Sequence, residues 1–182
     1  LKTTLLHQES TDQGELINFQ EIFRSIYKSS DLRVGFTIYN PRDSVLERMN
    51  NKNAQSFILN KSGREQVKSL LDKNAYHCII KERTYFTIAN IGTYIKKAGK
   101  EIFTKNLMEK EVKSCILAPV SNGYELLGIL ELVSSRKNEL NSINAIKLDD
   151  ILPYIITAVE RNKNEYENRI KAVIQNECTS IH

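Results

Sequence analysis

The chain has 182 residues and a formal net charge of +4. With 41% hydrophobic and 26% charged residues, 7 glycines and 3 prolines, it is neither collagen-like nor disordered. No apolar run approaches the ~20 residues of a membrane span, and no secretory leader is visible. The composition therefore predicts one cytoplasmic domain with no membrane partner.

The positive charge is concentrated between Lys61 and Lys113, where 12 Lys and Arg residues accompany 6 Asp and Glu residues. A basic surface attracts phosphates, but aromatic and Arg residues do not alternate with these lysines as in a nucleic-acid groove. We expect a solvated face and no nucleic-acid partner.

The three cysteines, Cys78, Cys115 and Cys178, form no CxxC pattern, and their number is odd. Neither a zinc site nor a disulfide framework is indicated. We expect three free thiols, with Cys115 buried because its strand is rich in apolar residues.

The first half of the chain predicts a helix followed by a hairpin. Residues 1–13 are polar and are expected to be loose. A helix is predicted from Gly14, because apolar residues recur there at helical spacing. Residues 32–39 alternate as in a strand, and a turn at 40–43 leads to a second strand. The apolar residues concerned are Leu16, Phe19, Phe23 and Ile26 in the helix, Val34, Phe36 and Ile38 in the first strand, and Val45 and Leu46 in the second.

The middle of the chain predicts short elements. Residues 56–59 read as a third strand, and Ser62 could cap a helix to about Asn74, with Val67, Leu70 and Leu71 pointing inward. Residues 77–91 are typical of β structure. Ile102, Phe103 and Leu107 indicate a short helix.

Two further elements complete the prediction. Asn122-Gly123 is a strong turn signal, and it predicts a hairpin between residues 114–120 and 124–133. A long helix is predicted from Asn141 or Ser142 to Cys178, kinked at Pro153. Strands joined mostly by hairpins, with helices gathered beside them, predict an α+β fold: an antiparallel sheet with flanking helices.

No catalytic pattern emerges from the sequence. Phosphate-loop, dinucleotide, zinc-protease and serine-hydrolase motifs are absent, and His77 and Cys78 would point to opposite faces of the expected strand. Glu125 and Glu131 share a face of one strand that we expect to be solvated. We predict no catalytic residue, no metal ligand and no cofactor, although an unknown small ligand remains open.

Residues 112–134, VKSCILAPVSNGYELLGILELVS, resemble a GAF domain. Pro119 lacks a ladder donor and suits a strand end, and Gly128 allows another backbone to approach closely. The resemblance covers about residues 14–162, and a PAS or profilin-like fold is the main rival. The residues that fit the pattern are Ser114, Ala118, Pro119, Val120, Gly128, Leu130, Glu131 and Leu132.

The resemblance implies a sensory or regulatory module of a larger bacterial signalling protein. Such modules hold a small ligand between the sheet and the covering helices, or they simply dimerise. Asn51-Lys52 and Phe57 fit a cyclic-nucleotide pattern, but Lys61-Ser62 stands where its acidic pair belongs. Bilin-binding members attach the pigment through a Cys that is often followed by His, whereas here His77 precedes Cys78. A haem would need an axial histidine, and only His77 could supply it. The candidate pocket residues are Tyr39, Phe57, Arg83, Tyr85, Phe86, Tyr94 and Cys115.

Two alternatives remain open from the resemblance. One is a thiol reductase of the methionine-sulfoxide type, although a spacing of 37 between Cys78 and Cys115 differs from the usual one. The other is a purely structural dimerisation module.

The end of the chain predicts a dimer helix. Residues 163–182 are expected to project as a helix or linker towards a missing neighbour. A seam with nearly heptad spacing would pair two copies into a homodimer, with a polar residue fixing the register. Its residues are Leu152, Ile155, Val159, Asn162, Tyr166, Ile170 and Val173.

Overall fold

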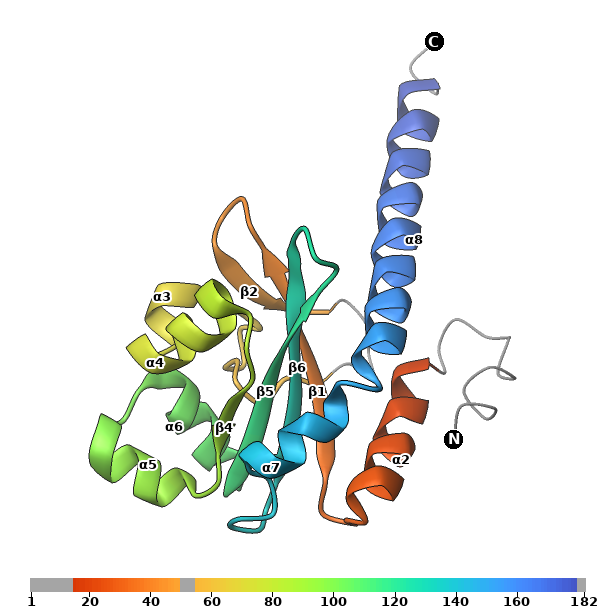
Figure 1. Cartoon of the computed structure of the whole chain (residues 1–182). Helices are drawn as coiled ribbons and strands as arrows, with labels where there is room; N and C mark the ends of the chain where they lie inside the picture. Colours follow the sequence, from red (N-terminus) through yellow and green to blue (C-terminus); the bar gives the residue numbers. More distant parts are fainter. Residues whose placement is uncertain (1–14, 50–54, 180–182) are drawn as a thin grey trace.

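The computed structural model describes residues 15–49 and 55–179, so the segment 1–13 lies outside the described residues. The described part forms a six-stranded antiparallel sheet with helices on both faces (Figure 1). The strand order is β3 (Arg64–Gln66), β2 (Val45–Arg48), β1 (Arg33–Asn40), β6 (Leu126–Ser134), β5 (Ser114–Ser121) and β4 (Phe86–Ile88). The predicted α+β architecture is confirmed.

The first three elements match the prediction. A helix is followed by two strands that pair as a hairpin, from Thr37 opposite Arg48 to Asn40 opposite Val45. The elements are α2 (Glu15–Tyr27), β1 (Arg33–Asn40) and β2 (Val45–Arg48).

The next stretch differs from the prediction at three places. Residues 56–59 form no strand, and 57–59 are bends, because the N–H groups of Phe57 and Ile58 bond to a carboxylate instead of a neighbouring strand. Ser62 begins no helix, because residues 64–66 pair with β2. The observed elements are β3 (Arg64–Gln66), α3 (Val67–Leu70), α4 (Lys73–Tyr76), the π-helix η1 (His77–Glu82) and β4 (Phe86–Ile88).

The predicted strand over 77–91 is therefore largely wrong. Asp72 caps α4 by accepting from the N–H of Ala75 at 2.8 Å, and the chain continues directly into η1. Ile79 of η1 is fully buried, so its apolar character reflects packing of a helix against the sheet. The inward positions Val67, Leu70 and Leu71 are buried, as predicted.

The remaining elements confirm the hairpin and revise the final helix. The elements are α5 (Ile91–Ala98), α6 (Ile102–Glu109), β5 (Ser114–Ser121), β6 (Leu126–Ser134), α7 (Ser142–Ala145), the 3-10 helix η2 (Ile146–Leu148) and α8 (Leu152–Thr179). Asn141 caps only α7, accepting from the N–H groups of Ile143 and Asn144. Pro153 kinks nothing, because it lies in the first turn of α8, where its missing N–H has no helical partner to lose.

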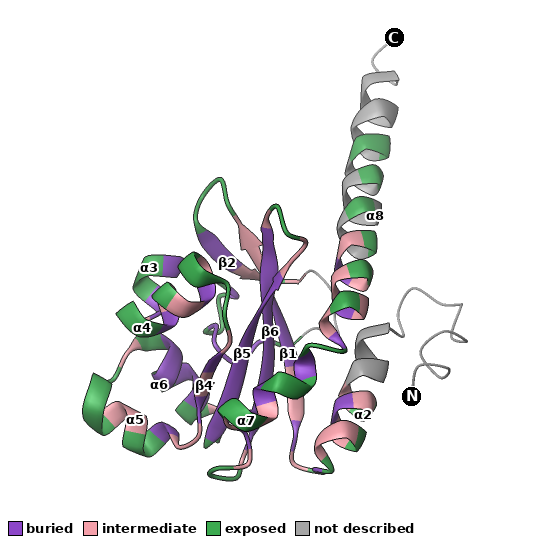
Figure 2. Cartoon of the chain, viewed as in Figure 1, coloured by how far each residue is buried: buried purple, intermediate pink, exposed green. Residues whose placement is uncertain are grey.

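The sheet is covered on both faces, and two cores result. One core lies under α3 to α6, and the other lies under α2, α7 and the start of α8. Every residue of β6, and all of β5 except Ser121, is buried (Figure 2). Alternation along β5 sends Cys115 and Leu117 to the first core and Ile116 and Ala118 to the second.

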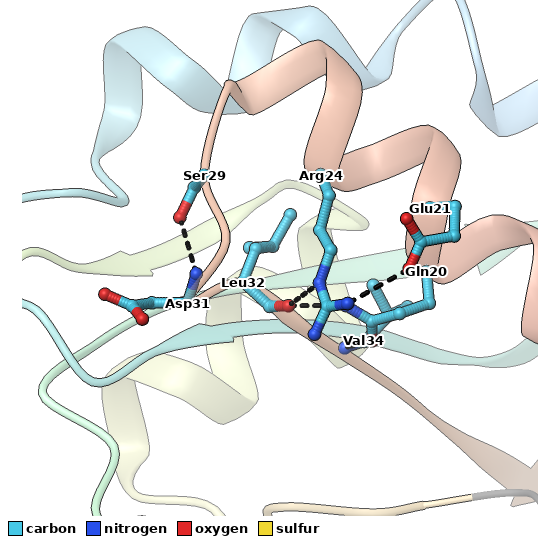
Figure 3. A network of polar contacts seen from close by, with 7 residues as sticks. All are labelled: Gln20, Glu21, Arg24, Ser29, Asp31, Leu32 and Val34. Atoms are coloured by element: carbon cyan, nitrogen blue, oxygen red, sulfur yellow. Dashed lines mark hydrogen bonds and ion pairs between the residues drawn. The ribbon is translucent and has the colours of Figure 1, made fainter.

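The helix α2 is fastened to the start of β1, on the edge that β2 leaves unpaired. The Gln20 side chain accepts from the N–H of Val34 at 2.8 Å and donates to the carbonyl of Leu32, which also accepts from Arg24 Nε at 3.1 Å (Figure 3). One residue pair further along, the N–H of Phe36 donates to the carbonyl of Gln55 at 3.0 Å. The side chain of Gln20 and the carbonyl of Gln55 thus satisfy backbone groups at the start of β1 that lack a partner strand.

Gly128 allows the central strands to approach closely. A Cβ at this position would lie 2.3 Å from the carbonyl oxygen of Thr37 and 2.6 Å from the ring of Phe36. Neither neighbour is the end of a flexible chain, so an added methyl group would have to move the sheet. This is the close approach that the sequence predicted for this glycine.

We expect Gly128→Ala to lower the free energy of unfolding by ~3 kcal/mol, because the methyl group overpacks the sheet. Gly92→Ala is the matched control: its Cβ would meet only Asn90 Oδ1, at 3.4 Å, and alanine suits a helix better by ~0.5–1 kcal/mol. Urea denaturation of both variants measures the effect. Equal free energies of unfolding for the two variants would contradict the predicted overpacking at Gly128.

Candidate functional site

The carboxylate of Glu131 lies in the middle of the sheet, under the helices α3 to α6, with none of its surface exposed. It accepts hydrogen bonds from the hydroxyl of Thr37 and from that of Ser56, the latter at 3.0 Å. It also accepts from the backbone N–H groups of Phe57 and of Ile58, the latter at 3.2 Å. Four donors therefore converge on one buried acid.

This finding overturns the expectation that Glu131 faces solvent. Its neighbours on the same face, Ile129 and Val133, belong to the core. Burial raises the pKa of Glu131, while the four hydrogen bonds oppose the shift. A single acid within an otherwise apolar strand was the sequence signal that could have revealed a buried group.

The segment bound by Glu131, residues 55–59, crosses the start of β1, and we call it the crossing segment. Its other side is held by α6 and the residue that follows this helix. Lys110 Nζ donates to three carbonyl oxygens of the crossing segment, at 2.6, 2.9 and 3.1 Å, and Asn106 Nδ2 donates to that of Ile58 at 2.7 Å. Partial burial lowers the pKa of Lys110, and the charge of Glu131 opposes this.

Phe57 seats the crossing segment on the sheet. Its ring lies over Gly35, where a Cβ would come within 2.8 Å of a ring carbon. The guanidinium of Arg33 stands 5.1 Å from the ring centroid and also donates to the carbonyl of Lys110 at 2.9 Å. The crossing segment has no regular secondary structure. It is fixed by the carboxylate of Glu131, by the cations of Lys110 and Arg33, and by the seating of its own Phe57 ring on the sheet.

The predicted pocket residues are only partly brought together. Phe57, Phe86 and Cys115 are buried in the core under α3 to α6, and Tyr39 and Tyr94 pack against it half-buried. Phe86 and Tyr94 make an edge-to-face contact with ring centroids 5.9 Å apart. These five side chains therefore share one face of the sheet.

Tyr85 and Arg83 lie elsewhere. Tyr85 packs against the opposite core, where its hydroxyl donates to Asp149. Tyr85 directly precedes β4, and it faces away from Phe86 because successive residues of an extended chain alternate in direction. Arg83 is exposed, and its guanidinium donates to the hydroxyl of Ser121 at 3.2 Å.

A hollow of about 410 Å³ opens beside the crossing segment. Its wall is formed by residues 59–62 together with Asn106, Glu109 and Lys110. None of the seven predicted pocket residues lines it.

The thiols follow the prediction as far as they are described. Cys115 is fully buried, and burial raises its pKa to about 12. Cys78 lies in η1, partly buried beside the same core, and both thiols are free. The side chain of Cys178 lies outside the described residues.

Metal-binding and membrane-spanning features were sought over residues 15–49 and 55–179. No group of three or more His, Cys, Asp or Glu residues in these ranges could hold a metal ion. None of their helices has the length and apolarity needed to cross a bilayer.

The structure describes the side chains of the predicted seam only as far as Val159. Ile155 and Val159 are buried against the sheet of their own domain, and Leu152 packs partly buried beside them. The side chains of Asn162, Tyr166, Ile170 and Val173 lie outside the described residues.

Comparison with known proteins identifies the fold. No protein-family model and no curated protein matches the chain. Among solved structures, the GAF domain of a two-component sensor histidine kinase from Bacillus halodurans is similar with a TM-score of 0.62 and 12% identity, over 86% of this chain and 99% of that one. The phycocyanobilin-bound GAF domain of a cyanobacterial phytochrome has a TM-score of 0.60 and 15% identity, over 90% and 92%.

Enzymes share the same fold. A free methionine-R-sulfoxide reductase from Neisseria meningitidis, in complex with its substrate, gives a TM-score of 0.60 and 12% identity, over 90% of this chain and 86% of that one. At such identities the comparisons speak for the fold alone. The chain has the GAF-like fold, which carries both sensory domains and reductases.

The crossing segment gives a testable prediction. Glu131→Met should lower the free energy of unfolding by ~3 kcal/mol, because methionine leaves the N–H groups of Phe57 and Ile58 without acceptors. Glu131→Gln should cost less, because an amide oxygen can serve those groups while the hydroxyls of Thr37 and Ser56 turn to accept. Urea denaturation at neutral pH measures the free energy of unfolding of the wild type and of both variants. A Met variant as stable as the wild type would show that the carboxylate is dispensable.

Proposed function

We propose that this chain is a non-catalytic sensory or regulatory module. A small ligand binds on the face of the sheet that α3 to α6 cover, and the terminal helices dimerise and relay the signal. The observation that carries the proposal is the helix α8, whose 28 residues begin against the sheet and continue beyond it (Figure 1). A helix that is anchored in a domain at one end and leaves it at the other can transmit a displacement.

The dimer contact is proposed for the part of α8 beyond Val159. Ile155 and Val159 already cover their own sheet, so they have little surface left for a second copy. Further along, the described side chains of Arg161, Asn164, Asn168, Lys171 and Ala172 are exposed, and all but Ala172 are polar. The seam proposed through Tyr166, Ile170 and Val173 avoids these positions, as a helix with one polar face requires.

The ligand region is proposed between the sheet and α3 to α6. Phe57, Phe86 and Tyr94 supply aromatic side chains there, and Lys110 adds a positive charge, although its three N–H donors are used by the carbonyls of the crossing segment. Arg83 lies outside this region. The excess of lysines on the covering helices favours an anionic ligand.

We expect the wild type to sediment as a dimer and Ile170→Glu/Val173→Glu as a folded monomer, because charges at a seam prevent pairing. Asn168→Glu/Ala172→Glu is the matched control: it adds the same charge at two exposed positions and should remain dimeric. Circular dichroism checks that each variant keeps its helices. A wild type that is monomeric at tens of micromolar would refute the dimer.

A thiol reductase is the second candidate, favoured by the solved reductases that share the fold. The state of Cys115 argues against it, since a thiol with a pKa of about 12 is not a thiolate at neutral pH. Cys78 is the more accessible of the two.

In a Cys178→Ser background we expect a thiol reagent to modify one group in the folded protein and two after denaturation. The group that reacts late is Cys115, because it is buried. Turnover of free methionine sulfoxide with a dithiol reductant, abolished by Cys78→Ser or by Cys115→Ser, would instead establish the reductase. Equal turnover rates in the wild type and in both serine variants would show that neither thiol takes part in the reaction.

A further inference from the structure

The helix η1 ends in an unusual way. It is a π-helix of six residues, in which one residue more than usual is fitted into the turn, and such turns occur often at functional sites. Arg83 closes it at φ 57°, in the left-handed region. The N–H groups of Arg83 and Thr84 both donate to the carbonyl of Cys78, the second at 2.9 Å. On its inner side, η1 buries Ile79 in the core of the proposed ligand face.

The side chain of Arg83 connects this helix end to the β5–β6 hairpin. Its Nη1 donates to the hydroxyl of Ser121, which in turn donates to the carbonyl of Glu125 at 2.8 Å. Asn122 Oδ1 accepts from the N–H groups of Tyr124 and Glu125, each at 3.0 Å. The tip of the hairpin is therefore closed by its own side chains and can move as one piece.

The same tip contacts the helix that leaves the domain. Asn122 Nδ2 donates to Glu160 Oε1 of α8 at 2.8 Å, close to the point where this helix stops packing on the sheet. A second contact joins the two regions independently, because Tyr85 donates to Asp149 just before α8 begins. The residues that follow η1 are thus linked to α8 through the hairpin tip, by way of Arg83, and to the approach of α8 directly, by way of Tyr85.

We propose that the end of η1 and the start of α8 are coupled through the tip of the β5–β6 hairpin, so that a change in packing beneath η1 alters how firmly α8 is held. This rests on the proposed function, in which α8 carries the output. The π-turn is the element with two states. If it relaxed to an α-helical register, the residue that follows would move by ~1.5 Å along the axis and ~100° around it. Arg83 could not then keep its bond to Ser121.

The chain offers variants that isolate each link. Arg83→Gly removes the guanidinium, and with it both the bond to Ser121 and the bond from Nε to the carbonyl of Ile80 at 3.2 Å, while keeping a residue that accepts a positive φ. Lys28→Gly is its matched control, since Lys28 is also exposed at a positive φ, 51°, at the end of α2. Glu160→Ala removes the acceptor on α8 and leaves the hairpin unchanged.

The test is hydrogen exchange of the backbone amides of residues 155–163, measured by NMR on the whole chain. We expect Arg83→Gly and Glu160→Ala each to speed this exchange by about threefold to tenfold, the effect of one lost hydrogen bond. Arg83→Gly/Glu160→Ala should exchange no faster than Glu160→Ala alone, because both changes break one path. Lys28→Gly should leave these rates unchanged.

Three results would overturn the coupling. The first is an exchange rate in Arg83→Gly equal to that of the wild type, and the second is the same result in Glu160→Ala. The third is a rate in the double variant that is raised by the product of the two single effects. Sedimentation of the same samples tests the proposed function separately. A monomeric wild type with the expected exchange pattern would refute the dimeric output while leaving the coupling intact.

Discussion

The carboxylate of Glu131 joins the most buried strand of the sheet to a segment with no regular secondary structure of its own. Two backbone N–H groups and two hydroxyls converge on it, and the opposite side of the crossing segment is bound by Lys110 and Asn106. Because buried polar groups without partners are costly, each side of this arrangement requires the other. The helix α6 is thereby held at a fixed distance from the sheet, and the core beneath it depends on that distance.

The same arrangement shapes the face where a ligand is proposed. In this structure the chain's own backbone already occupies part of the space over β1, with Phe57 seated on Gly35. Any ligand on this face therefore lies beside the crossing segment or moves it. The carboxylate of Glu131 and the ammonium of Lys110 are both saturated by groups of the chain itself, so neither is free to bind a ligand unless the crossing segment moves.

The opposite face works differently. There the core is almost entirely apolar, and the helices α2, α7 and the start of α8 cover it. The hydrogen bonds to side chains on this face lie mainly at its margins, at Gln20, Arg24, Tyr27 and Tyr85, and at the buried hydroxyls of Ser114 and Ser134 at the strand ends. The start of α8 is held here mainly by apolar packing, whereas α6 is also held by a buried polar network. Under the proposed function, the output through α8 therefore lies on the apolar face of the sheet, and the polar framework lies on the face of α6.

The sequence by itself determined the elements that local signals specify. Alternation and the Asn122-Gly123 turn defined the central hairpin, helical spacing defined α2 and α6, and the GAF resemblance rested on Gly128 and Pro119. Tertiary structure decided the rest. Residues 56–59 and 77–82 are rich in apolar residues, yet one became a bent segment and the other a π-helix, because their partners come from β6, α6 and the core. Glu131 looked like a surface residue because nothing nearby in sequence supplies its donors, which lie 73 to 94 residues away. Pairings over such separations leave no local pattern, so only the folded chain reveals that its one fully buried carboxylate among the described residues is a structural centre.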